Sequence, residues 1–150
     1  MTVEVRPATA ADEDRVFELL TQLINQEIAQ SEEARQVYRE LLTWERGCAL
    51  VVTEGDDVLG VITASFNPAV RYGGMYAQIE ELVVDERARG KKGGAALVRG
   101  LVDASREHGC REIGLYPREE TRAFYERLGF AYVGVELRMQ LADHPGARRD

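Results

Sequence analysis

The stretch of this 150-residue sequence best suited to chemistry is a basic, glycine-rich turn at residues 87–94. Four of its first six residues are basic, and two of these, Lys91 and Lys92, are the only lysines in the chain. The pattern predicts a strand ending at Val84 before the turn and a helix from about Gly94 after it, so the turn presents free backbone N–H groups at a helix N-terminus. These groups, the helix dipole and the neighbouring cations favour a bound phosphate over a merely solvated basic turn.

The spacing of this turn excludes two common nucleotide-binding motifs. Asp85 stands where the first glycine of a P-loop belongs, and Lys92 stands in place of its serine or threonine. Gly90, Gly93 and Gly94 lack the spacing of the dinucleotide-binding fingerprint. The sequence therefore indicates neither a nucleotide kinase nor a dinucleotide-dependent dehydrogenase.

The elements that must position this turn follow the order β-α-α-β-β-β-α-β-α-β. Apolar residues recur at helical spacing in some segments, and β-rich runs bounded by turn residues fill the others. In chain order, the sequence predicts a strand at 3–5, a helix that follows N-cap candidates at 9–12 and has apolar residues from 16 to 24, and a helix that starts at 31 and is stopped by Gly47. It then predicts a hairpin of strands at 48–53 and 58–66, a loop at 67–74, a strand at 76–84, a helix at 94–107, a strand at 113–116, a helix at 120–128 and one or two strands within 130–141. This order predicts a mixed α/β fold with a largely antiparallel sheet.

The turn resembles the pyrophosphate loop of the GCN5-related N-acetyltransferase (GNAT) superfamily. In that loop an Arg or Gln is followed, after two residues, by Gly, any residue, and Gly or Ala. Here Arg89 takes the first place and Gly94 the last, while Lys92 replaces the usual middle glycine. Residues 124–130, Phe-Tyr-Glu-Arg-Leu-Gly-Phe, resemble the family's other hallmark, and the element order matches, so the likeness covers residues 2 to about 141.

The resemblance implies the acyl-CoA N-acyltransferase fold of that superfamily: a single domain over residues 1–150, with 142–150 a flexible tail, and a twisted, mostly antiparallel sheet flanked by helices on both faces. It implies acetyl-CoA as co-substrate, with the fourth strand splaying from the fifth to bind the pantetheine arm. The residues expected to hold acetyl-CoA are Leu82, Val83, Val84, Arg89, Gly90, Lys91, Lys92, Gly93, Gly94 and Ala95. No metal is expected, because the sequence offers no cluster of metal ligands.

Acetyl transfer to an amine needs a bound thioester, a neutral nucleophile and a proton for the leaving thiolate. Tyr125 stands where the family has a tyrosine beside the cofactor sulfur, and a phenol with a pKa of ~10 can protonate a thiolate whose conjugate acid has a pKa of ~8.5. Glu80 and Glu81 are the candidate bases, and strand alternation predicts that they point to opposite faces. We favour Glu80, acting through water or binding the substrate ammonium; two solvated strand acids are the alternative.

The charge distribution narrows the range of partners. The net charge is -7, with 17 acids against 6 arginines up to Glu86 and 9 acids against 13 bases from Arg87 onward. We expect the acidic first part to attract a cationic acceptor and the basic second part to hold an anionic ligand. The overall negative charge disfavours nucleic acid and anionic membranes as partners.

The remaining features favour a cytoplasmic protein. No run of ~18 apolar residues occurs, and the first residues lack the pattern of a signal peptide. Cys48 and Cys110 are expected to be free thiols in a reducing compartment.

We therefore predict an N-acetyltransferase that moves acetyl from acetyl-CoA to a primary amine of a small molecule or peptide in a ternary complex. A non-catalytic acyl-CoA-binding module of the same fold is the alternative. The acceptor's identity and the oligomeric state stay open, although a homodimer through the last strands is common in families of this kind.

Overall fold

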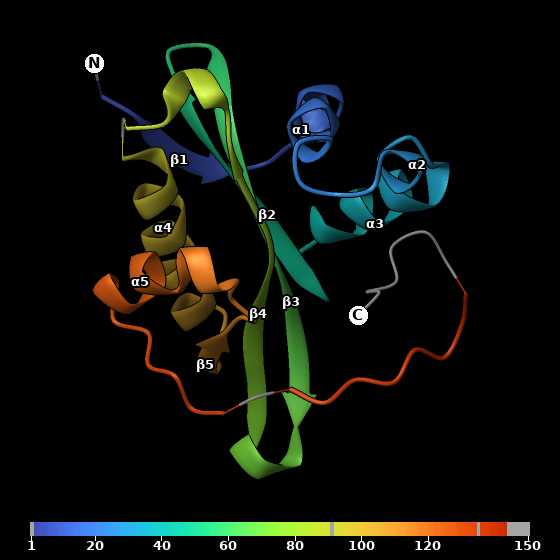
Figure 1. The fold of residues 1–150 in the computed structure, drawn as a ribbon, viewed down its shortest axis with the longest axis vertical. Helices are drawn as coiled ribbons and strands as arrows, with labels where there is room; N and C mark the ends of the chain where they lie inside the picture. The colour runs from blue at the N-terminus through green and yellow to red at the C-terminus, as the bar shows by residue number, and fades with distance from the viewer. Residues whose placement is uncertain (1, 91, 135, 144–150) are drawn as a thin grey trace.

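Five β-strands form one twisted sheet in the computed structural model, which describes residues 2–90, 92–134 and 136–143 (Figure 1). The strands lie side by side in chain order: β1 (Glu4–Pro7), β2 (Gly47–Glu54), β3 (Asp57–Ala69), β4 (Gly74–Val84) and β5 (Cys110–Gly114). Neighbours among the first four strands pair antiparallel, whereas β4 and β5 run parallel. The predicted mixed, largely antiparallel sheet is confirmed.

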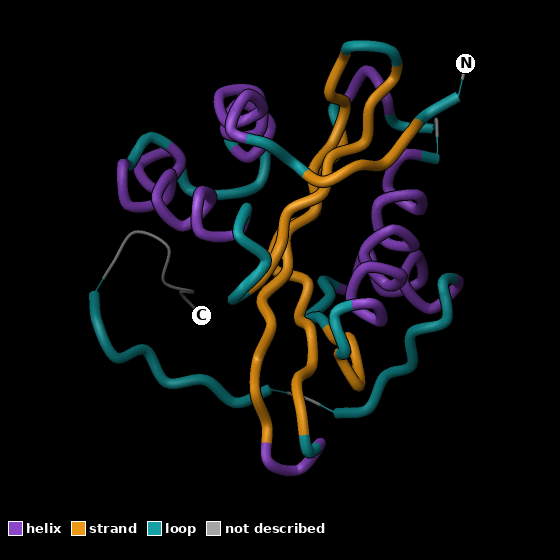
Figure 2. The backbone as a smooth tube through the Cα atoms, turned by 180° about the vertical axis from the view of Figure 1, so that it is seen from behind, coloured by secondary structure: helices purple, strands orange, loops and turns teal. Residues whose placement is uncertain are grey.

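Helices cover both faces of this sheet, as Figures 1 and 2 show. One face carries α1 (Glu13–Leu20), α2 (Gln26–Ala29) and α3 (Glu32–Leu41), and the other carries α4 (Gly93–Glu107) and α5 (Glu119–Arg127). Short 3-10 turns occur at Ala10–Asp12, Val70–Tyr72 and Glu86–Ala88. None of the helices in the described ranges combines the length and apolar character that a membrane span requires.

Two apolar clusters, one on each side of the sheet, hold these layers together. The cluster beneath α1 and α3 includes the fully buried Val16, Leu19, Val51 and Val61. The cluster beneath α4 and α5 includes Ile62, Leu97, Val98 and Leu101, which are equally buried. Because burying one such side chain contributes about 1.5–3 kcal/mol, these clusters fix the sheet between its helices.

The hairpin that joins β3 and β4 is longer than the sequence predicts. A loop is predicted over residues 67–74, but β3 continues to Ala69 and β4 begins at Gly74. The two strands pair up to the turn because Gly73 adopts the left-handed backbone, with φ at +60°, that closes it. The hairpin therefore projects as a long ribbon from one end of the sheet (Figure 1).

The structure also places the ends of other helices and strands at residues that differ from the predicted ones. The first helix, with helical spacing predicted to reach Ile24, ends at Leu20. The strand predicted at 113–116 lies instead at Cys110–Gly114, because pairing with β4 sets its register. The strands predicted within 130–141 are wrong for the described residues there, which pair with no neighbour in one chain. Most of the predicted tail, 142–150, lies outside the described residues.

Candidate active site

β4 and β5 separate partway along β4, which opens the sheet at its centre. Their ladder ends at Gln78, opposite Gly114, whereas β4 continues to Val84. Beyond Gln78, in the described part of the chain, β4 pairs on its β3 side alone. The peptide groups of Leu82, Val83 and Val84 on the other side are therefore available to a ligand. This is the geometry that the predicted pantetheine site requires.

The turn that follows β4 leads directly into α4. Two of its residues have left-handed backbone: Gly90, with φ at +94°, and Lys92, with φ at +63°. Lys92 stands where the GNAT pattern has glycine, and a side chain in this conformation costs about 1–2 kcal/mol. Arg89, Gly90 and Lys92 are exposed, and Lys91 lies outside the described residues.

The first turn of α4 is suited to an anion. Gly93 and Gly94 begin the helix, and a β-carbon on Gly94 would lie 3.7 Å from the Val84 side chain and 3.5 Å from Phe124. The helices α1, α2, α3 and α5 each begin with acidic side chains that suit the helix dipole, whereas α4 has no acid in its first turn and no side-chain cap. Its N–H groups, including that of Ala95, are thus left for an external anion such as a pyrophosphate.

Asp85 anchors the start of this turn to α1. Its carboxylate is almost fully buried and accepts hydrogen bonds from the Arg15 guanidinium of α1 and from the Arg87 N–H, the latter at 2.9 Å. Arg15 also donates to the Val58 carbonyl at 3.0 Å. The hydrogen bond from Arg15, supported by those from Arg87, lowers the pKa of Asp85 far below its usual range. The turn is therefore held in place before any ligand binds.

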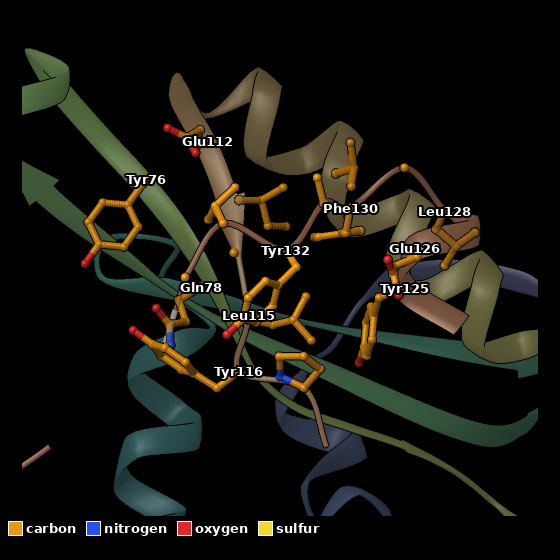
Figure 3. Close-up of a pocket in the computed structure, with 18 of the residues that line it drawn as sticks. Tyr76, Gln78, Glu112, Leu115, Tyr116, Tyr125, Glu126, Leu128, Phe130 and Tyr132 are labelled. Carbon is orange, nitrogen blue, oxygen red and sulfur yellow. The ribbon is translucent and has the colours of Figure 1, made fainter. Parts of the chain in front are cut away.

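A pocket of about 550 Å³ opens where β4 leaves β5 (Figure 3). Gln78 and Gly114, the last pair of the ladder, line it together with Tyr125 of α5. The Tyr125 ring packs edge-to-face on Phe124 and Phe130, with centroids 5.0 and 5.7 Å apart. Burial raises the pKa of the Tyr125 hydroxyl, which keeps it protonated and able to donate a proton.

Glu80 and Glu81 lie on the same face of β4, and the predicted opposite orientation is wrong. Thr63 of β3 pairs with Glu81 and the next residue, Ala64, pairs with Ile79, so Glu80 forms a β-bulge. The extra residue shifts the phase of the strand, which is why Ile79 and Leu82 both pack into the α4-side cluster. Glu80 and Glu81 lie between these two residues in the chain, so both glutamates face the α1–α3 side of the sheet.

The two glutamates differ in environment. The exposed Glu80 accepts a hydrogen bond from the Ser65 hydroxyl at 2.8 Å. Glu81 is mostly buried and accepts from the Thr63 hydroxyl. Burial, reinforced by the neighbouring Glu80, raises the pKa of Glu81 above its usual range despite the hydrogen bond from Thr63. The pair thus combines one accessible carboxylate, that of Glu80, with one whose pKa is raised by burial, that of Glu81.

Sequence reasoning missed much of the pocket wall. Tyr76 and Gln78 precede Glu80 at alternate positions and line the pocket (Figure 3), and this period-2 row was the signal that could have revealed them. The Arg71 guanidinium lies 4.6 Å from the Tyr72 ring centroid and 5.3 Å from that of Tyr76. Two more arginines, Arg106 and Arg122, also line the pocket.

The described residues contain no group of three or more His, Cys, Asp or Glu side chains that could hold a metal ion. His108 instead stacks on Phe66, with ring centroids 4.5 Å apart.

Comparisons with known proteins agree with this geometry. A model of the acetyltransferase (GNAT) family matches residues 16–130. A glucosamine 6-phosphate N-acetyltransferase of Arabidopsis thaliana is 28% identical over 142 residues, which cover 91% of this chain and 95% of that protein. A probable glucosamine 6-phosphate N-acetyltransferase 2 of Oryza sativa subsp. japonica is 40% identical over 68 residues, covering 45% of this chain and 41% of that protein's length.

One solved structure shows how fully the fold is shared. The structure of AAC(6')-Iy in complex with a bisubstrate analogue, CoA-S-monomethyl-acetylneamine, matches with a TM-score of 0.80 at 15% identity, covering 95% of this chain and all of that one. The family model spans most of the sequence, including the turn before α4 and the helix that carries Tyr125. The chain is an N-acetyltransferase and belongs to the acetyltransferase (GNAT) family.

Proposed function

We propose that the enzyme transfers acetyl from acetyl-CoA directly to a primary amine bound in the pocket beside Tyr125. The observation that carries this proposal is that the β4–β5 ladder ends at Gln78 and Gly114, the residues that open the pocket. A cofactor whose pyrophosphate lies at the N-terminus of α4 and whose pantetheine follows Leu82–Val84 would direct its thioester toward this pocket.

The reaction involves three groups: the amine of the acceptor, the thioester of acetyl-CoA and the hydroxyl of Tyr125. The neutral amine attacks the thioester carbonyl, a C–N bond forms, and the C–S bond breaks to release a thiolate. Tyr125 donates the proton that this thiolate needs, because burial keeps its hydroxyl protonated. The nitrogen of the new amide loses one proton to water, and water returns a proton to the phenolate.

The amine must lose its own proton, and we assign this to the two glutamates. Glu80 is exposed and follows the pocket residues Tyr76 and Gln78 at alternate positions of β4, although it does not itself line the pocket, and we assign it to the ammonium of the acceptor at the edge of that pocket. Glu81, reached through water, accepts the proton, because burial raises its pKa above the usual range of a glutamate. The acidic first part of the chain would favour capture of a cationic ammonium.

A narrower candidate for the acceptor is a phosphorylated amino sugar. The curated relatives include glucosamine 6-phosphate N-acetyltransferases. Such a molecule carries an ammonium that suits Glu80 and a phosphate that suits a guanidinium, and three arginines, Arg71, Arg106 and Arg122, line the pocket. We propose this class ahead of polyamines, which would offer the arginines no anion.

An acceptor panel tests both proposals. The purified chain is incubated with acetyl-CoA and glucosamine 6-phosphate, glucosamine, spermidine or an N-terminal peptide, and release of free thiol is followed. We expect the highest kcat/KM for glucosamine 6-phosphate. A preference for spermidine would refute the phosphate proposal, and cofactor binding without thiol release for any amine would favour the non-catalytic module.

We also propose a homodimer as the working form, supported by the exposed apolar side chains near the C-terminal end of the described chain. We further propose a cytoplasmic location, for which the free Cys48 and Cys110 are the support.

A further inference from the structure

A row of polar side chains on β3 lies beside the two glutamates of β4. The row consists of Thr63, Ser65 and Asn67. Ala64 and Phe66, which alternate with these residues, pack into the α4-side cluster. The polar row therefore lies on the α1–α3 side of the sheet, which Glu80 and Glu81 also face. Because β3 and β4 are paired neighbours (Figure 1), side chains of the row can reach both glutamates.

The Thr63 hydroxyl forms two hydrogen bonds with Glu81, and the direction of each is fixed. The backbone N–H of Glu81 donates to Thr63 Oγ1 at 3.1 Å. An N–H can only donate, so the hydroxyl accepts this bond and keeps its own proton for another acceptor. That acceptor is Glu81 Oε1. Among the described residues, Thr63 thus occupies Oε1 of Glu81, and Oε2 is the oxygen left to take up a proton.

The Ser65 hydroxyl is oriented toward Glu80 in the same way. The side-chain amide of Asn67 donates to Ser65 Oγ at 3.0 Å, and Ser65 Oγ donates to Glu80 Oε2 at 2.8 Å. The amide nitrogen of Asn67 cannot accept, so the proton of Ser65 is directed to the carboxylate. Two hydrogen bonds in series therefore hold the exposed carboxylate of Glu80 by one of its oxygens.

The bulge in β4 gives each hydroxyl its own glutamate. Ser65 pairs with Gln78, and a regular ladder continued from this pair would place Thr63 opposite Glu80 and turn Glu81 to the α4 side. The extra residue instead brings Glu81 opposite Thr63 and leaves Glu80 to Ser65. The bulge and the polar row of β3 thus act together on the two carboxylates.

Several charged side chains of α1 and α3, the helices on this face, are joined in ion pairs. These pairs join Arg15 to Glu18 and Asp85, Arg35 to Glu13 and Asp14, and Arg39 to Glu13 and Glu32. After α5, the Arg138 guanidinium pairs with Glu136 and also feels the charge of Glu80. Burial raises the pKa of Glu81 most, the Thr63 hydrogen bond lowers it, and Glu80 raises it. Thr63 therefore opposes the effect of burial on Glu81.

We propose that Thr63 and Ser65 are positioning residues of the acetyl transfer, Thr63 through Glu81 and Ser65 through Glu80. This inference rests on the proposed function. Ser65 holds Glu80 for the ammonium of the acceptor. Thr63 holds Oε1 of Glu81, so the ammonium gives one proton to a bridging water and that water gives one to Oε2. The ammonium becomes a neutral amine, Glu81 becomes a carboxylic acid, and the acid later returns its proton to solvent.

Thr63→Val removes the hydroxyl and keeps the shape of the side chain. In ¹³C NMR of the chain without ligands, assigned with Glu81→Gln, we expect the titration of the Glu81 carboxyl carbon to move up by about one pH unit, because the ionised form loses a hydrogen bond. The rising limb of kcat/KM for the best amine of the acceptor panel should move by the same amount. Thr63→Ser keeps the hydroxyl and should leave both at their wild-type values. Thr53→Val is the matched control, since Thr53 is also buried but donates to the Glu4 carbonyl.

The two measurements distinguish failure of the inference from failure of the proposed function. A Glu81 titration that Thr63→Val leaves unmoved would overturn the inference and leave the proposed function standing. A titration that moves while the limb of kcat/KM stays in place would show that Glu81 is not the base. That result would refute the proposed role of Glu81 and, with it, the positioning role of Thr63.

Ser65→Ala tests the role of Ser65 through binding of the amine. We expect the KM for the amine to rise about threefold, since water replaces part of the hydrogen bond to the exposed Glu80, while kcat and the KM for acetyl-CoA change little. Ser65→Thr keeps the hydroxyl and is expected to restore the wild-type KM. An unchanged KM in Ser65→Ala, or a raised KM that Ser65→Thr does not restore, would overturn the role of Ser65.

Discussion

Tyr125 shows how one residue's surroundings suit it to its proposed role. A tyrosine hydroxyl in water is already a weak acid, and burial between Phe124 and Phe130 weakens it further. The group therefore stays protonated until a stronger base, such as a thiolate, forms beside it. The same packing holds the ring at the pocket, so the hydroxyl is positioned without a mobile side chain.

Removal of this hydroxyl is expected to slow the chemical step. We predict that Tyr125→Phe lowers kcat by about 10²-fold or more, as loss of a general acid does, and leaves the KM for acetyl-CoA nearly unchanged. Steady-state kinetics with free-thiol detection provide the measurement. Tyr116→Phe is the matched control, since Tyr116 lines the same pocket and is expected to keep most of the activity. An unchanged kcat for Tyr125→Phe would mean that water protonates the thiolate.

Glu81 should link both activity and stability to pH. Its pKa is raised in the folded chain, so ionising Glu81 costs more in the folded than in the unfolded state. The wild type therefore loses stability as pH rises from the unfolded value of about 4.3 through the raised folded value. We predict that Glu81→Gln removes this loss, and that denaturant unfolding at several pH values shows it more stable than wild type at neutral pH.

The activity of the same variant gives an independent readout. The wild-type kcat/KM is expected to rise with pH as Glu81 ionises, and Glu81→Gln is expected to be slower and to lack that step. If the two pH profiles coincide, Glu81 is not the base. The difference in stability between wild type and Glu81→Gln would then reflect only the burial of the Glu81 side chain.

At the scale of elements, Asp85 couples α1 to the turn that precedes α4. Asp85→Asn keeps the shape but weakens the hydrogen bonds from Arg15 and Arg87. A looser turn should bind the pyrophosphate less well. We predict that the KM for acetyl-CoA rises about fivefold, the equivalent of a hydrogen bond worth about 1 kcal/mol, while the KM for the amine changes little.

Asp12→Asn is the matched control for this prediction. Asp12 is as buried as Asp85 and accepts two hydrogen bonds from Arg6, at 2.8 and 3.0 Å, but it lies outside the turn. Both variants should be less stable in thermal unfolding. If both raise the acetyl-CoA KM equally, the effect follows general destabilisation, and Asp85 does not position the turn.

Features that depend on a few neighbouring residues could be predicted from the sequence, whereas features that depend on the pairing of distant segments could not. The turn at 87–94 and the helix that carries Tyr125 could be predicted because glycines, cations and helical periodicity are signals within a few residues. The common face of Glu80 and Glu81 could not, because the bulge depends on how β4 pairs with β3, which the sequence of β4 alone does not specify. Tyr76 and Gln78 were missed as pocket residues although they lie in the predicted strand, because the side of that strand that borders the pocket depends on where β4 leaves β5.

The segment after α5 illustrates the same limit at the scale of the whole molecule. The sequence predicts one or two strands within 130–141, yet no strand forms among the described residues there, since a strand needs a neighbour with which to pair. The uneven distribution of charge along the sequence is likewise a property of the whole molecule. We expect the acidic part, up to residue 86, to attract the ammonium of the acceptor and the basic part after it to hold the cofactor.

At the point where β4 and β5 separate, we propose that acetyl passes directly from acetyl-CoA to the amine. The most direct test is a single-turnover experiment with acetyl-labelled acetyl-CoA and an excess of enzyme, with and without glucosamine 6-phosphate. Direct transfer predicts that label reaches the amine only when both substrates are present, and that mass spectrometry finds no acetylated chain in the absence of the amine. An acetylated enzyme formed before the amine is added, or no labelled amine at all, would contradict direct transfer in a ternary complex.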